Sequence, residues 1–171
     1  MRLKRLLIPA VIAALALTAP AVAQDPVIDY ATDDPQMNTA IAEAQATLPL
    51  FLAHALDAQG KGSDVALVKV GFPTVDSSEM DVEHIWVSLF ARHEDGSFTG
   101  MLANEPVALG DLRAGDEVAF TQAMISDWHM TAPSGLFWGS YTSRVMYEQG
   151  AFGDTPFDQL FEADPVPAGW K

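Results

Sequence analysis

The spacing of apolar residues changes once along this 171-residue chain, near Gly60–Gly62, and that change sets the fold class. Before it, apolar residues recur at helical spacing, at Met37, Ile41, Ala44, Leu48, Leu52 and Ala55. After it, apolar and polar residues alternate as they do in strands. One long N-terminal helix before about five strands predicts an α+β domain, with the helix packed on one face of a twisted, mainly antiparallel sheet. The pattern fits both an open sheet and a small barrel.

The helix is predicted to begin after Asp33-Asp34, because an Asp can cap a helix and Pro35 is tolerated in its first turn. Pro49 lies within the run and has no N–H group, so we expect a kink there. The segment Gln59-Gly60-Lys61-Gly62-Ser63 is predicted to end the helix.

Five later segments have strand-like patterns: Val65–Phe72, Val82–His93, Phe98–Asn104, Glu117–Thr121 and Leu136–Tyr147, the last interrupted by Gly139. The turn Glu94-Asp95-Gly96 joins the second and third, so residues 82–104 are expected to form a hairpin. Alternation in the second segment places Ile85, Val87 and Leu89 on one face, and His84, Trp86, Ser88 and Phe90 on the other. Ile125-Ser126-Asp127-Trp128 is expected in a loop or short turn.

Residues 1–23 have the three zones of a secretory signal peptide. Arg2, Lys4 and Arg5 come first, an apolar run follows, and Ala21-Val22-Ala23 precedes the predicted cleavage site at Gln24. We then expect a flexible leader at 24–34, the α+β domain at 35–147 and an acidic, proline-containing tail at 148–171. The tail is predicted to be mostly irregular, with a helical turn at Phe157–Phe161.

Cysteine is absent, which excludes disulfide bonds, thiolate ligands and a lipid anchor on an N-terminal cysteine. The protein is therefore predicted to be periplasmic or secreted, with no membrane anchor after signal cleavage. The chain has a net charge of −14, and the signal carries three of its nine Lys and Arg and none of its 23 acids, so the mature protein would carry −17. This charge disfavours nucleic acid and anionic lipid, and it suits either a cationic partner or simple solubility.

Sequence motifs of the common enzyme classes are absent, including the phosphate loop, the dinucleotide fingerprint, His-Glu-x-x-His and Gly-x-Ser-x-Gly. The four histidines, His54, His84, His93 and His129, show no paired ligand spacing. The sequence therefore predicts no metal and no cofactor, and it disfavours an enzyme without excluding one.

Seven residues are candidates for binding: His84, Trp86, Asn104, Ser126, Asp127, Trp128 and Arg144. Ser126-Asp127 has two interpretations. Its side chains either cap a turn, or they belong to a recognition loop in which Trp128 supplies the contact surface. Trp86 is either covered by the tail or exposed as a binding surface.

Two of the candidates have further structural interpretations. Asn104 precedes a turn at Glu105-Pro106, and its side chain is expected to bond to local backbone. Arg144 is expected to form a buried or half-buried salt bridge, with Asp127 as the candidate partner, and anion binding is the alternative.

Five short motifs follow one another between about Met37 and Val145: Glu83-His84-Ile85-Trp86-Val87, Gly100-x-Leu102-Ala103-Asn104-x-Pro106, Gly115-Asp116-x-Val118-x-Phe120, Ile125-Ser126-Asp127-Trp128 and Gly139-x-Tyr141-Thr142-x-Arg144. In this order they resemble the bacterial domain of unknown function family 2314, which includes the YegJ-like proteins. The resemblance implies a small α+β domain that is sometimes exported. It implies no established activity, substrate or catalytic residue.

The sequence supports three functional hypotheses. The first is a non-catalytic protein-binding or inhibitor-type module of the cell envelope, which the small size, the acidity and the lack of catalytic motifs favour. The second is a structural or accessory domain without a ligand, in which His84, Asp127 and Arg144 all serve internal hydrogen bonds. The third is a small envelope hydrolase, in which these three residues and Glu83 converge in one pocket with at least one shifted pKa.

Overall fold

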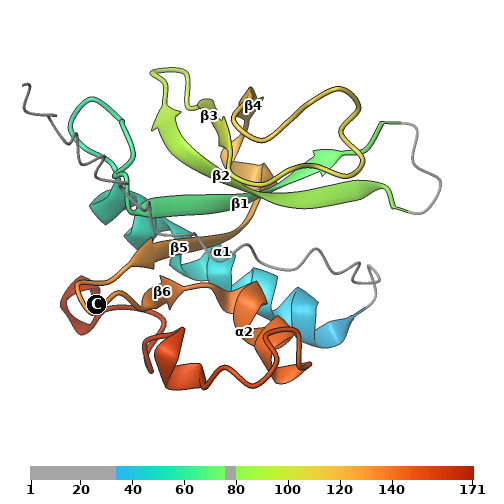
Figure 1. The fold of residues 1–171 in the computed structure, drawn as a ribbon. Coiled ribbons are helices and arrows are strands. Elements are labelled where there is room, and N and C mark those ends of the chain that lie inside the picture. Colours follow the sequence, from blue (N-terminus) through green and yellow to red (C-terminus); the bar gives the residue numbers. More distant parts are fainter. Residues whose placement is uncertain (1–33, 76–79) are drawn as a thin grey trace, which may run out of the picture.

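The computed structural model describes residues 34–75 and 80–171 (Figure 1). Its first element is helix α1, Pro35–Ala55, and the predicted cap is confirmed. The Asp34 carboxylate accepts hydrogen bonds from the main-chain N–H groups of Gln36 and Met37, at 2.8 and 3.2 Å. The helix continues through Pro49 and ends before the glycine-containing segment that was expected to end it. The predicted signal peptide, and the leader as far as residue 33, lie outside the described residues.

Six strands follow: β1 Ala66–Pro73, β2 Val82–Arg92, β3 Phe98–Leu102, β4 Glu117–Phe120, β5 Ile125–Thr131 and β6 Phe137–Gly139. Each neighbouring pair is antiparallel, and the strands form an open sheet in the order β4-β3-β2-β1-β5-β6. The predicted α+β class and the antiparallel sheet are confirmed, with six strands rather than about five. The order places β1 and β2 in the middle, flanked by β5 and β3.

Helix α1 lies along one face of this sheet and forms the main core with it (Figure 1). The ring of Phe51 stacks on Trp128 of β5, with centroids 4.8 Å apart, and both side chains have no exposed surface. Val68 and Val70 of β1 lie in the same core, and they are fully buried too. Burial of such a side chain stabilises a fold by about 1.5–3 kcal/mol, so this helix–sheet interface is a major source of stability.

The predicted hairpin is confirmed for β2 and β3, and Gly96 adopts the left-handed conformation (φ 84°) in its turn. The predicted faces are wrong for two residues of β2. The register shifts between Ser88 and Ala91, and Leu89 itself is left-handed (φ 48°). Because this bulge reverses the alternation, Leu89 is 53% exposed and Phe90 is fully buried in the core.

The expectation of a loop at Ile125–Trp128 is wrong, because these residues begin strand β5. A single 3₁₀ turn, η1 at Gln122–Met124, leads into the strand. Ile125, Ser126, Asp127 and Trp128 are all buried. Their order is apolar, polar, polar, apolar, so the segment lacks the alternation by which a half-buried strand is recognised in a sequence.

The strand expected from Leu136 to Tyr147 is wrong beyond Gly139, although the break at this glycine was expected. Strand β6 ends there, and helix α2 runs from Tyr141 to Glu148. Gly139 (φ 67°) and Ser140 (φ 55°) are both left-handed, and this turn redirects the chain from a strand into a helix.

The C-terminal residues include the predicted helical turn, seen as the 3₁₀ turn η2 at Phe157–Gln159, and a second one, η3 at Ala168–Trp170. Phe161 and Val166 are buried, with 3% and 4% exposure. In Figure 1 this segment runs below α2 and β6 and returns towards the end of α1. Among the described residues, no helix is both long and apolar enough to cross a membrane.

Candidate functional site

The sheet face opposite α1 carries most of the polar residues that the sequence singled out. The strand register places Lys69 of β1 directly between Trp86 of β2 and Asp127 of β5. His84 lies on β2 and Ser126 on β5, the two strands that flank β1. The fold therefore brings together four of the seven candidates, His84, Trp86, Ser126 and Asp127. Of all seven, only His84 is exposed.

Asp127 is fully buried, and it caps helix α2 from a neighbouring strand. Its carboxylate accepts hydrogen bonds from the main-chain N–H groups of Tyr141 and Thr142, at 3.2 and 2.8 Å, and from the Thr142 hydroxyl at 2.6 Å. Ser140, the N-cap residue by sequence, makes no side-chain cap bond. A carboxylate at the positive end of a helix satisfies N–H groups that lack partners within the helix. The capping interpretation is thus supported, with the cap on a helix rather than a local turn.

Lys69 is the buried cation that accompanies Asp127. Its Nζ donates to the Thr142 hydroxyl at 3.0 Å, which in turn donates to the Asp127 carboxylate. The same Nζ lies 4.7 Å from the ring centroid of Trp86, a cation–π distance. Burial raises the pKa of Asp127, and the charge of Lys69 together with the bonds from Thr142 and Trp128 partly offsets that rise.

Trp86 is 5% exposed, so of the two interpretations of this side chain, the exposed binding surface is wrong. Its ring lies against His129 of β5, with centroids 4.7 Å apart. His129 also stacks on Phe137 of β6, again at 4.7 Å. The indole is therefore one member of a row of three rings, which come from β2, β5 and β6.

His84 and Ser126 form a hydrogen-bonded pair across β1, with 2.8 Å between Nδ1 and Oγ. The residue of β1 opposite His84 is Gly71, and a side-chain carbon there would lie 3.1 Å from the imidazole Cε1. The absence of a side chain at Gly71 thus lets the ring lie over β1 and reach Ser126. Although His84 as a whole residue is exposed, the part of its ring that lies over β1 is shielded from water, and this desolvation, followed by the charge of Lys69, lowers the pKa of His84.

Trp128 lies on the opposite face, inside the core. Besides stacking on Phe51, its indole Nε1–H donates to the Ala44 carbonyl at 3.2 Å and the Thr47 hydroxyl at 3.1 Å. Gly139 packs against it so closely that a side-chain carbon would lie 2.3 Å from the Trp128 carbonyl oxygen. A side chain without exposed surface cannot supply a contact area, so the recognition-loop interpretation of Trp128 is wrong.

Arg144 of α2 does not form the expected salt bridge with Asp127; its bonds go to main-chain carbonyls. Its guanidinium donates to the oxygens of Gly139 and Glu162, both at 2.8 Å, and of Phe137 at 3.3 Å. Desolvation lowers the pKa of Arg144. The five donors of an arginine suit this role, because one side chain can hold several carbonyl groups of separate segments.

The two remaining residues of interest lie near the loop after β3. Glu83 is buried, and its carboxylate accepts hydrogen bonds from the N–H groups of Val107 and Ala108, both at 2.8 Å. Asn104 does not form the expected local bond through its carbonyl: its Oδ1 is buried, and no hydrogen-bond partner reaches it within the described structure. Glu83 thus anchors the loop that Asn104 begins.

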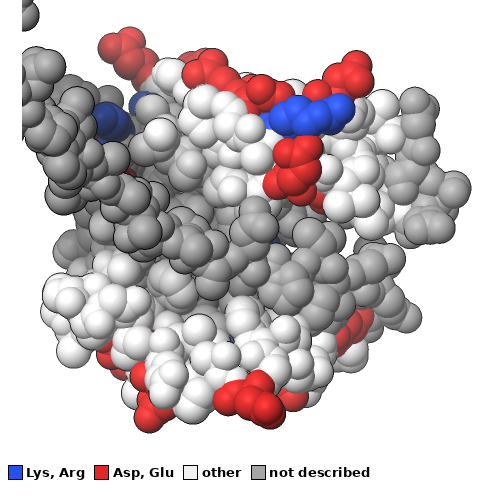
Figure 2. Space-filling view, in the orientation of Figure 1, with Lys and Arg blue, Asp and Glu red and all other residues white. Residues whose placement is uncertain are grey.

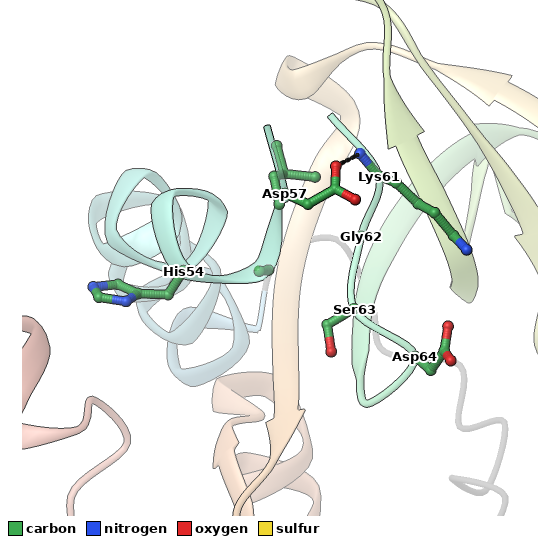
Figure 3. A pocket seen from close by; sticks show the side chains of 8 residues that line it. His54, Asp57, Lys61, Gly62, Ser63 and Asp64 are labelled. Atoms are coloured by element: carbon green, nitrogen blue, oxygen red, sulfur yellow. Dashed lines mark hydrogen bonds between the residues drawn. The ribbon is translucent and has the colours of Figure 1, made fainter. Parts of the chain in front are cut away.

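A separate shallow hollow of about 410 Å³ lies between the end of α1 and the start of β1 (Figure 3). Of the two carboxylates that line it, that of Asp57 is occupied by hydrogen bonds to nearby main chain. The Asp57 carboxylate accepts bonds from the N–H groups of Gln59 and Lys61, both at 2.9 Å. In Figure 3 the His54 ring points away from the other labelled residues. This ring stacks on Trp170, with centroids 4.5 Å apart. None of the seven candidates lines this hollow.

Glu83, Asp127 and Arg144 each bond to main-chain groups of other segments, so these side chains stabilise the fold and do not form one set of reactive groups. Three residues that complete the polar cluster, Lys69, Gly71 and Thr142, were not among the candidates. Lys69 could have been suspected, because it is a lone charge within an otherwise apolar strand. Across residues 34–75 and 80–171, no group of three or more His, Asp and Glu side chains could hold a metal ion.

This architecture defines a small α+β domain in which an antiparallel sheet is covered by a helix on one face and carries a buried polar cluster on the other. The chain belongs to a family described as uncharacterized proteins conserved in bacteria (DUF2314), whose model matches residues 34–155. No curated protein and no solved structure showed a significant match. The family resemblance in the sequence motifs is thus confirmed, whereas the YegJ-like relationship and export stay predictions.

Proposed function

We propose that this protein is a non-catalytic binding module of the bacterial cell envelope, and that it recognises a cationic protein partner. The observation that carries this proposal is the distribution of surface charge. Among the described residues, most Asp and Glu side chains are exposed, whereas the exposed Lys and Arg are only Lys61, Arg92, Arg113 and Lys171. Two of these four are already paired, Arg113 with Glu105 and Lys171 with Asp164.

Acidic groups lie along both the upper and the lower margin of the face shown in Figure 2, and cationic groups are few. A surface of one sign accelerates association with a partner of the opposite sign, and it repels nucleic acid and anionic lipid. The predicted signal peptide supports a periplasmic or secreted location, where such a partner would be met.

The hydrolase hypothesis has little support from the contacts. It required Glu83, His84, Asp127 and Arg144 to converge in one pocket. Instead Glu83 anchors a loop, Asp127 caps α2 and Arg144 holds main-chain carbonyls. His84 contacts a serine, but Ser126 is 4% exposed and has little surface for a substrate to approach.

A structural or accessory role without a ligand is the second candidate. The observation that favours it is the same set of internal bonds, since His84, Asp127 and Arg144 all have partners within the domain. This role predicts that exposed charges can be neutralised without functional loss, so one experiment separates it from the binding module.

The test uses residues 24–171 immobilised for capture from bacterial envelope extract, with elution by salt. One variant neutralises Glu94, Asp111 and Glu117 on the β2–β4 side of the sheet, as Gln, Asn and Gln. A second variant with the same change in charge neutralises three exposed acids on the α2 side, Glu148→Gln, Asp154→Asn and Asp158→Asn. All six are exposed, so neither variant should unfold.

The binding module predicts a basic protein that the unmodified domain retains at low salt and releases at high salt. It further predicts that one of the two variants loses this protein while the other keeps it, because a specific interface lies on one side. Retention by both variants at the same salt concentration would contradict the proposal and leave the accessory role.

A further inference from the structure

The last sixteen residues, 156–171, form a strap over the family domain, and they lie beyond its match at 34–155. Only two of their side chains are buried, Phe161 and Val166. The connection that precedes the strap is exposed around Gly153, which is left-handed (φ 60°) and has open space around its Cα. The strap is thus joined to the domain by an exposed loop, and its own contacts hold it in place: Val166 lies in the hydrophobic core, and Trp170 packs against that core.

The first point of attachment is the free edge of the sheet. The N–H of Phe137 donates to Leu160 at 2.9 Å, the N–H of Glu162 donates to Phe137 at 3.1 Å, and the N–H of Gly139 donates to Pro165 at 2.7 Å. Phe137 and Phe161 form a parallel bridge. The strap therefore occupies the edge of β6 as an added strand does when an extended peptide docks on a sheet.

The second point of attachment is Arg144. Its guanidinium carbon lies 5.3 Å from the ring centroid of Phe157 and 5.0 Å from that of Phe161, and it donates to the carbonyl of Glu162. An arginine can therefore hold both the backbone and the aromatic side chains of an extended segment.

The third point of attachment is an aromatic slot at the end of α1. Trp170 stacks on His54, with centroids 4.5 Å apart and planes within 3° of parallel. It also lies 6.0 Å from Trp128 and 6.0 Å from Trp138. The slot accepts a large flat ring, and all of its walls belong to the family domain.

We propose that the edge of β6, Arg144 and the slot at His54 form a groove for an extended peptide with a tryptophan, which residues 156–171 occupy within the same chain. The receiving surface lies within residues 34–155, whereas the strap supplies extended backbone and aromatic rings. A peptide partner of this chemistry would bind by replacing the strap. This inference is independent of the acidic surface, so failure to find a cationic partner leaves it intact.

The experiment uses the full mature chain with a protease site placed in the exposed connection around Gly153. After cleavage, a fluorescent peptide of residues 156–171 is added, and binding is followed by anisotropy while circular dichroism reports the fold. We expect the cut chain to stay folded and to exchange its strap for the labelled peptide. The uncut chain, whose groove is filled, should bind little of it.

Two variant peptides show whether the slot is used. Trp170→Ala in the peptide should weaken binding by at least about tenfold, because it removes the stacked ring, while exposed Gln159→Ala should change it by less than about twofold. The proposal is overturned if the Trp170→Ala peptide binds as tightly as the original, or if the uncut chain binds it equally well. Unfolding of the cut chain once the strap is competed away would also overturn it, because the strap would then be part of the core.

Discussion

The Asp127 carboxylate joins strand β5 to the first turn of α2, and its removal tests the described network most directly. In Asp127→Ala the N–H groups of Tyr141 and Thr142 lose their acceptor inside the protein. The Thr142 hydroxyl loses its 2.6 Å partner, and buried Lys69 loses the nearby negative charge. We expect α2 to be loosened at its N-terminus and the positive charge of Lys69 to lose the offsetting charge of Asp127.

The size of the effect follows from these contacts. An unsatisfied buried donor costs about 1–3 kcal/mol, and a buried charge without its partner costs about 3–5 kcal/mol. These contributions share atoms, so we expect a loss near 4–6 kcal/mol rather than their sum. A domain of this size has a free energy of unfolding of about 5–15 kcal/mol, so Asp127→Ala should be close to unfolding.

Urea unfolding of residues 24–171, followed by tryptophan fluorescence, measures this loss. Asp127→Asn keeps the shape and one acceptor oxygen, so it should lose less, about 2–3 kcal/mol, and it supplies the value if the alanine variant does not fold. The exposed acid Asp158 is the matched control, and Asp158→Ala should stay within about 0.5 kcal/mol of the parent. A loss below about 1 kcal/mol for Asp127→Ala, with an unchanged denaturant slope, would refute the capping role.

Three further predictions concern single positions. Because the pKa of His84 is lowered in the folded state, its contribution to stability is present above an unfolded-state pKa of about 6.5 and is lost as the pH falls through the folded-state value. Urea titrations across this range should therefore show a steeper loss for the parent than for His84→Gln, and equal slopes would count against it. Leu89→Asn should raise stability by up to about 1 kcal/mol, since Asn tolerates the left-handed backbone of this exposed residue; a lower urea midpoint would contradict this. Gly139→Ala should cost more than about 2 kcal/mol, because the new carbon would meet Trp128, whereas Gly135→Ala, equally left-handed but unobstructed, should cost about 1 kcal/mol; similar losses would show that close packing is not the cause.

The elements that the sequence predicted well are those whose signals are local. The Asp34 cap, the helical spacing of the first segment and the Gly96 turn each depend on residues a few positions apart. The alternation of β1 and of the first half of β2 is equally local. The bulge at Leu89 reversed that alternation, and no residue type near it announces a left-handed leucine.

The candidate site was predicted less well, because its roles depend on contacts between distant segments. Ser126 and Asp127 suggested a loop because polar residues seldom lie in a buried strand. They are tolerated there since Ser126 is paired with His84, 42 positions away, and Asp127 with Thr142, 15 positions away. Arg144 likewise holds a carbonyl 18 positions away rather than a carboxylate.

By itself, the sequence determined the fold class, the leading helix, the hairpin and the family, since spacing and turn chemistry act over short stretches of chain. It also singled out most residues of the polar face. Only the tertiary structure decided that Trp128 is core, that Asp127 caps a helix and that the C-terminal residues cover an edge of the sheet. The physical reason is that the free energy of a buried polar or aromatic side chain depends on the partners around it, and those partners come from segments that only the folded chain brings together.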